Sequence, residues 1–134
     1  MNKRLEEILA PAVYAIPIAD CDTTLESAEF YEMGMSRKVL AVAYIDTLAA
    51  GQWFEVQLRQ DVDASGATDP EDLGDEVRVL APAGGGPVIV QVEADVSEMN
   101  LAEGKRFVGV AIESEAQCDA GAVLIFGDNR YNPA

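Results

Sequence analysis

After Pro11, apolar and polar residues alternate in short runs, and this alternation restricts the fold more than any other feature of the chain. Side chains of a β-strand point alternately to opposite faces of a sheet, whereas an amphipathic helix repeats every 3.6 residues. In the run 87–96, for example, Val88 and Val90 fall on one face and Gln91 falls on the other. The pattern therefore predicts strands that turn one face toward a core.

Comparable runs recur along the chain, separated by turns rich in Gly, Pro, Asp and Asn. Besides 87–96, they cover residues 13–18, 24–32, 37–46, 52–60, 77–80, 106–114 and 121–126. About eight short strands with frequent turns are typical of a β-sandwich. We therefore predict an all-β, single-domain β-sandwich over residues 12–134, jelly-roll-like or Ig-like, although an open barrel uses the same alternation.

Two stretches lead to more specific expectations. Residues 37–46 are apolar on both faces, which predicts a central strand covered on both sides. Residues 61–76 are polar and contain Gly66, Pro70 and Gly74, so they predict a long connection with one helical turn near residues 70–73.

The N-terminal segment, residues 1–11, differs from the rest. Leu5, Ile8 and Leu9 have helical spacing and Pro11 ends the pattern, which predicts a short helix or an arm. A helix of fewer than three turns is marginal alone, so this segment docks on its own domain, docks on a neighbouring subunit, or stays mobile.

Charge and composition exclude several classes of function. The chain has 24 acidic and 9 basic residues and a formal net charge of -15, which repels a phosphate backbone, so we expect no direct nucleic-acid partner. The charge either favours a basic partner surface or reflects an acidic host proteome. The chain has no His, the commonest general base and a frequent metal ligand. We expect no enzymatic activity, no metal and no cofactor.

The start of the chain is charged and no apolar run reaches the ~18 residues of a membrane span. We therefore expect synthesis in a host cytoplasm and no membrane partner. The cysteines, Cys21 and Cys118, have neither Cys-x-x-Cys spacing nor a nearby His. We expect reduced thiols that act as small buried hydrophobes. A disulfide between them is the alternative, and nothing in the sequence sets their distance.

The stretch Asp61–Asp72 places oxygen donors at positions 1, 3, 5, 9 and 12 and Gly66 at position 6, as in an EF-hand calcium loop. The flanking residues do not predict helices, and Asp72 replaces the bidentate Glu of such loops. A solvated loop between strands is therefore the favoured interpretation, with calcium as the alternative.

Two further binding functions depend on exposed side chains. Trp53, beside the inward Phe54, is the best candidate for an exposed aromatic, either as a carbohydrate platform or as a subunit contact. Paired carboxylates of a glycosidase are compatible with any all-β scaffold, and no spacing in the sequence indicates them.

Four stretches of the chain together form a recognisable pattern, in which strands are followed by a short C-terminal sequence. They are Arg37–Asp46, Gly51–Gln60 with the following ASGA at 64–67, KRFVGVA at 105–111, and GAV at 121–123 with GDNRYNPA at 127–134. This pattern resembles small virion proteins of tailed phages and prophages that coat the head exterior, called head decoration or capsid cement proteins.

The resemblance implies a structural virion protein on the capsid exterior, which binds the major capsid protein and stabilises the shell by bridging coat subunits. It also implies a homo-oligomer, a dimer or a trimer. The interface residues that we predict are Leu5, Ile8 and Leu9 in the arm, Trp53, and Arg130 and Tyr131 in the tail. A phage neck or tail component, and a calcium- or carbohydrate-binding sandwich, are the alternatives.

Overall fold

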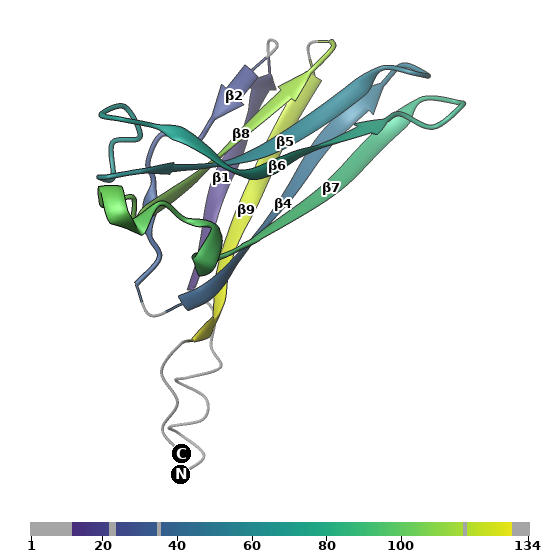
Figure 1. The fold of residues 1–134 in the computed structure, drawn as a ribbon. Helices are drawn as coiled ribbons and strands as arrows, with labels where there is room; N and C mark the ends of the chain where they lie inside the picture. Colours follow the sequence, from purple (N-terminus) through teal and green to yellow (C-terminus); the bar gives the residue numbers. More distant parts are fainter. Residues whose placement is uncertain (1–11, 22–23, 35, 117, 130–134) are drawn as a thin grey trace.

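The computed structural model describes residues 12–21, 24–34, 36–116 and 118–129, and in it two antiparallel sheets pack face to face (Figure 1). The arm at 1–11 and the predicted contacts Leu5, Ile8, Leu9, Arg130 and Tyr131 lie outside the described residues. Within the described ranges, no helix is long and apolar enough to span a membrane.

The first sheet has four strands and the second has five. In spatial order, the first consists of β1 (Ala12–Cys21), β9 (Cys118–Asn129), β4 (Ser36–Leu48) and β7 (Gly86–Asp95). The second consists of β2 (Thr24–Glu26), β8 (Phe107–Ser114), β5 (Trp53–Asp61) and β6 (Glu71–Leu80), with β3 (Tyr31–Glu32) also paired to β8. Two short 3-10 helices, η1 (Val96–Glu98) and η2 (Leu101–Glu103), connect β7 to β8.

The order of the strands identifies the type of sandwich. β1 pairs with β9 and β2 pairs with β8, while β4 pairs with β7 and β5 pairs with β6. Strands from opposite ends of the chain therefore become neighbours, as if one long antiparallel hairpin had been wrapped around a core. This topology is that of a jelly roll, so the predicted all-β sandwich is confirmed in its jelly-roll form.

The core lies between the two inner faces and follows the alternation in the sequence. In β5, the side chains of Phe54, Val56 and Leu58 are fully buried, and in β7 the even-numbered residues from Val88 to Ala94 are buried. Both sets match the faces that the sequence predicts. Since most of the core is built from such alternating positions, a slip of one residue in β5 or β7 would turn its apolar side chains to solvent.

The predicted long connection at 61–76 is wrong in its second half, because β6 already begins at Glu71. The first half of β6 is an edge strand in which Leu73 is buried and most neighbours are exposed, so its sequence resembles a loop. Gly74, at φ +70°, lies where the pairing with β5 shifts register between Val56 and Leu58. A strand with a bulge can therefore accommodate the glycine that suggested a turn.

The predicted continuous strand at 24–32 is also wrong, because the chain bends between β2 and β3. In this bend Phe30 is buried, and its ring lies against Gly109, where an added Cβ would come within 2.2 Å of the ring. Gly109 lies between the inward-facing Val108 and Val110, so Phe30 covers the outer side of β8. The bend exists because this ring leaves the plane of the strands and packs on the back of its own sheet.

Candidate functional site

The outer side of the four-stranded sheet is the largest departure from expectation. β4 is central, between β9 and β7, as predicted, and its residues Val39, Ala41, Ala43 and Ile45 are fully buried. The predicted cover on its second side is wrong, because the alternate residues are half-buried or exposed. We call the apolar residues of this side the open face, and they are Leu40, Val42, Tyr44, Ile89, Val123 and Ile125.

The register of the strands makes the open face continuous. Leu40 lies opposite Ile125, and Val42 lies opposite Val123, across the β4–β9 ladder. On the other side of β4, Tyr44 lies opposite Ile89, whose exposure of 64% is the highest of any large hydrophobic residue described. Cross-strand partners on one face have Cβ atoms about 5 Å apart, so these side chains form one patch rather than scattered contacts.

The charged outward residues of β4 and β7 flank the open face, and one of them, Glu93, lies directly opposite Leu40. At one end, Lys38 pairs with Glu93 at 3.5 Å, and both side chains are about half exposed. At the other end, Asp46 accepts hydrogen bonds from the Thr47 backbone and hydroxyl and from the Tyr44 hydroxyl, which together hold the pKa of this carboxyl below its usual value. Between these ends the polar outward residue of β7 is the neutral Gln91. Across the β4 ladders, Val42 and Tyr44 therefore have no charged partner, so the centre of the face is uncharged.

The outer side of the five-stranded sheet has a different character. Arg78 donates from Nε and Nη2 to the Glu55 carboxylate at 2.8 and 2.6 Å. Arg59 pairs with Asp72 and lies 3.8 Å from Glu26 on β2. We call Glu26, Glu55, Arg59, Asp72 and Arg78 the ion-paired face. The alternation of residues 52–60 places Glu55 on the outward face, yet Arg78 covers its carboxylate and the residue is buried.

Trp53, the one predicted contact residue that the structure describes, lies at the corner of the ion-paired face. It is half-buried, and the Arg78 guanidinium lies 4.2 Å from the centre of its ring. Leu80, its partner across the β5–β6 ladder, is 61% exposed. One side of the indole is thus occupied by a cation–π contact. The role of Trp53 in an interface stays a prediction.

In the loop that resembles a calcium site, the carboxylates accept hydrogen bonds from the loop itself. Asp61 is fully buried and accepts hydrogen bonds from the backbone of Val62, Thr68 and Asp69. Hydrogen bonds from Ser65 and Thr68 lower the pKa of the Asp63 carboxyl, which marks it as an internal acceptor. No group of three or more His, Cys, Asp or Glu among the described residues could hold a metal ion. The geometry favours the structural interpretation of this loop.

Lys105 contacts the end of this loop with its buried ammonium group. Its side chain is 1% exposed, lies 2.9 Å from Asp69 Oδ2 and 3.7 Å from Glu71, and donates to the Asp69 carbonyl. Burial lowers the pKa of Lys105, but the hydrogen bond and charge of Asp69 and the charges of Glu71 and Glu103 outweigh burial and raise it. The ammonium therefore stays protonated and acts as an internal cation for a loop of carboxylates. The sequence showed the acidic residues of this loop but not the lysine that they surround.

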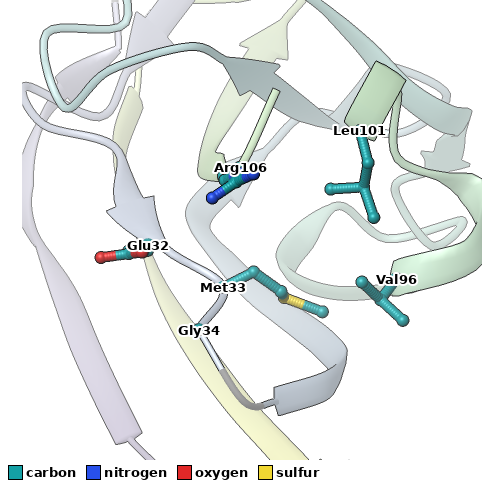
Figure 2. Close-up of a pocket in the computed structure, with 6 residues that line it drawn as sticks. All are labelled: Glu32, Met33, Gly34, Val96, Leu101 and Arg106. Atoms are coloured by element: carbon teal, nitrogen blue, oxygen red, sulfur yellow. The ribbon is translucent and has the colours of Figure 1, made fainter. Parts of the chain in front are cut away.

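One pocket lies near the end of the sandwich where β4 begins, with a volume of about 300 Å³. In Figure 2, the side chains of Met33, Val96 and Leu101 face a common space, and Glu32 points away from it. Arg106 and Gly34 complete the lining. The lining combines three apolar side chains with polar groups of the charged residues and the backbone, and since Glu32 points away, these polar groups do not converge as they would in an active site.

No family model matches this chain, and no curated protein matches it either. Among solved structures, a chain in the structure of the infectious bursal disease virus Gt strain has 10% identity and a TM-score of 0.50, over 88% of this chain and 33% of that chain. A chain in the cryo-EM structure of broad bean stain virus has 12% identity and a TM-score of 0.45, over 95% and 93%. The carbohydrate-binding module CBM28, described as specific for non-crystalline cellulose, has 12% identity and a TM-score of 0.45, over 89% and 75%.

These likenesses concern the fold. The protein spans about a third of the infectious bursal disease virus chain that it resembles. Fold and site together define a jelly-roll domain that has one outer face completed by its own side chains and another that is apolar and open.

Proposed function

We propose that the protein is a structural virion component, a head decoration protein that coats the exterior of a tailed-phage capsid as a homo-oligomer. The observation that carries this proposal is the open face, since a continuous apolar patch on a soluble protein marks an interaction site. Its chemistry is binding and not turnover. The jelly-roll fold, which is also that of viral capsid domains, and the resemblance of the sequence to head decoration proteins support a place in a virion.

The occupant that we assign to the open face is a second copy of this chain. Each copy has a formal charge of -15, so most of its surface repels another copy. The centre of the open face carries no charge on β4 or β7, and two copies that meet there keep their carboxylates apart. A basic partner would instead be attracted to the acidic remainder of the surface.

The size of the face corresponds to a weak contact between copies. Its residues lie on β4, β7 and β9, and three strands about 4.8 Å apart over a length of about 15 Å give on the order of 200 Å² on each copy. Two copies would bury roughly 400 Å² there, below the ~1,000 Å² of a stable specific interface, so we expect self-association at high protein concentration. The contacts to the major capsid protein are assigned to other parts of the chain, the arm with Leu5, Ile8 and Leu9 and the tail with Arg130 and Tyr131.

The first experiment is co-sedimentation of the purified protein with expanded phage capsids that lack decoration protein. Saturable binding in a fixed ratio to coat protein is expected, and a chain lacking residues 1–11 should bind weakly if the arm supplies the contact. Absence of binding by the full chain would overturn the decoration function. In intact virions, hundreds of copies per particle are expected, whereas about a dozen would indicate a neck or tail component.

The second experiment tests the open face through a matched pair of variants. Ile89→Glu and Leu80→Glu each place a carboxylate on a strand residue of nearly equal exposure, 64% and 61%, but on different sheets. Ile89→Glu should weaken self-association at least tenfold in analytical ultracentrifugation, and Leu80→Glu should leave it unchanged. The reverse result would move the contact to the corner of Trp53. A wild-type protein that is monomeric at high concentration would exclude the homo-oligomer.

A further inference from the structure

The two cysteines of the chain, far apart in the sequence, are cross-strand neighbours. Cys21 is the last residue of β1 and Cys118 is the first residue of β9. In the β1–β9 ladder Cys21 lies directly opposite Cys118, one step beyond the pair Asp20 and Asp119. Directly opposed residues of an antiparallel pair have Cα atoms about 4.5 to 5.5 Å apart, within the range of about 4.4 to 6.8 Å that a disulfide requires.

The register also places both positions on one face of the sheet. Ala120 is buried and Asp119 is exposed, and alternation along β9 assigns position 118 to the face of Ala120. Residues directly opposite each other in a ladder share a face, so position 21 belongs to the same face. The backbone therefore satisfies the two requirements for a bridge, which are separation and common orientation.

The location of the two cysteines determines which part of the fold a disulfide would stabilise. Among the strands that the structure describes, β1 is at the edge of its sheet and pairs with β9, and β2 begins at Thr24 in the opposite sheet. Cys21 thus lies where the chain leaves the first sheet. A covalent link here would close a loop that contains β2 to β8, and cross-links that close long loops restrict the unfolded chain most.

We propose that Cys21 and Cys118 form an intrachain disulfide that fastens edge strand β1 to β9 once the protein leaves a reducing compartment. A small disulfide such as oxidised glutathione is the oxidant. One cysteine thiolate attacks it and releases one glutathione thiolate, and the second cysteine thiolate then displaces the other. The two protein thiols lose two protons and two electrons, and the small disulfide is reduced to two thiols.

A Cys21–Cys118 disulfide would form with or without a decoration function, and it suits a protein that is made in a cytoplasm and acts outside it. The expectation of reduced thiols would then describe the newly made protein, and the bridged form would describe the protein after release. Edge strand β1 directly follows the arm at residues 1–11, so the bridge would fasten the strand that connects the arm to the rest of the fold.

The test is a thiol count on the full chain, at low protein concentration, before and after treatment with oxidised glutathione. In denaturant, the reduced protein should show two reactive thiols and the oxidised protein none, with a mass lower by two hydrogens. Peptide mapping should find Cys21 linked to Cys118. Two thiols that persist after oxidation, glutathione bound to each cysteine, or a disulfide between two chains would each overturn the proposal.

Thermal unfolding gives an independent measurement. The oxidised protein should melt roughly 10 °C above the reduced protein. Cys21→Ser and Cys118→Ser should each lose this difference between oxidising and reducing buffer while keeping the circular dichroism of the reduced wild type. If either variant fails to fold, the thiol count and the peptide map on the wild type decide. An equal melting temperature for the bridged and reduced wild type would show that the link does not stabilise the fold.

Discussion

The outer faces of the two sheets cover the same core from opposite sides, yet they are completed in different ways. On the five-stranded sheet, the Phe30 ring covers Gly109, and Arg78 covers Glu55. On the four-stranded sheet, Val42 is half-buried and Ile89 is largely exposed, without a charged neighbour at the centre. The outer side of the five-stranded sheet is covered by contacts within the chain, so these contacts contribute to the stability of the monomer. That of the four-stranded sheet leaves apolar area exposed, and its contribution depends on a partner.

The largest expected loss of stability comes from a substitution on the outer side of the five-stranded sheet. Phe30→Ala removes a buried ring from its slot against Gly109 and should lower the free energy of unfolding by about 3 to 5 kcal/mol. Ile89→Thr on the open face should change it by less than about 0.5 kcal/mol. Chemical denaturation at a concentration where the protein is monomeric measures both. Equal losses in the two variants would contradict the distinction between the faces.

A second comparison uses one ion pair from each face. Arg78→Leu leaves the buried Glu55 carboxylate without its two guanidinium hydrogen bonds, so the melting temperature should fall by about 5 °C. Lys38→Leu removes half of an exposed pair with Glu93 and should leave the melting temperature within about 1 °C of the wild type. A large loss in Lys38→Leu would mean that the charges at the end of the open face matter for the fold.

Lowering the pH should eventually decrease the free energy of unfolding, whereas it should strengthen the association of copies through the open face. Backbone hydrogen bonds from Thr47 and Ser97, and hydroxyl hydrogen bonds to Asp63, hold the pKa values of Asp46, Asp95 and Asp63 below the usual carboxyl value. A lowered folded-state pKa adds stability above the unfolded value, near 4, and this stability is lost as the pH falls through the folded value. Unfolding free energy should therefore be nearly constant from about pH 7 to 5 and fall below about pH 4.

Over the interval from about pH 7 to 5, the net negative charge begins to decrease while the fold stays intact, so open-face association should strengthen slightly. Sedimentation and denaturation measured at the same pH values separate the two effects. Parallel losses of association and stability over this interval would show that the open face and the fold are not independent. Asp63→Asn should lose less stability between pH 5 and 3 than the wild type.

The smallest effect is expected from Glu76, which lies beside the ion-paired face. A hydrogen bond to Glu55 and the charge of Glu55 raise the pKa of the Glu76 carboxyl. A raised carboxyl pKa in the folded state means that its ionisation opposes folding as the pH rises through that value. Glu76→Gln should therefore raise the melting temperature by about 1 °C at pH 7, and the gain should disappear below about pH 4. A decrease at pH 7 would indicate that Glu76 instead stabilises Arg78.

Much of the fold could be predicted because its determinants are local. Alternation predicts the inward face of β7 with Val88 and Val90 and that of β5 with Phe54, and these residues are buried. Errors arose where distant contacts override a local pattern. Phe30 leaves its strand to pack on Gly109, and the polar start of β6 becomes a strand only because β5 lies beside it.

The candidate site was harder to predict than the fold. The apolar residues Leu40 and Val42 were visible in the sequence, but an apolar outer face has the same pattern as a strand buried on both sides. Alternation along 87–96 puts Ile89 on the face opposite Val88 and Val90, but nothing local shows that it joins Tyr44 across the β4–β7 ladder. Among the predicted contacts, Trp53 is described, and it lies on the other sheet.

The amino-acid sequence is enough to show that this chain forms strands, which face of most of them is buried, and that the protein is strongly acidic and lacks His. These properties depend on the identity of each residue and its near neighbours. Contacts between distant segments decide that the sandwich is a jelly roll, that Lys105 lies among the carboxylates of a loop, and that Cys21 lies opposite Cys118 in the β1–β9 ladder. The physical reason is that strand pairing joins residues far apart in the chain, and the register of a ladder appears in neither strand alone.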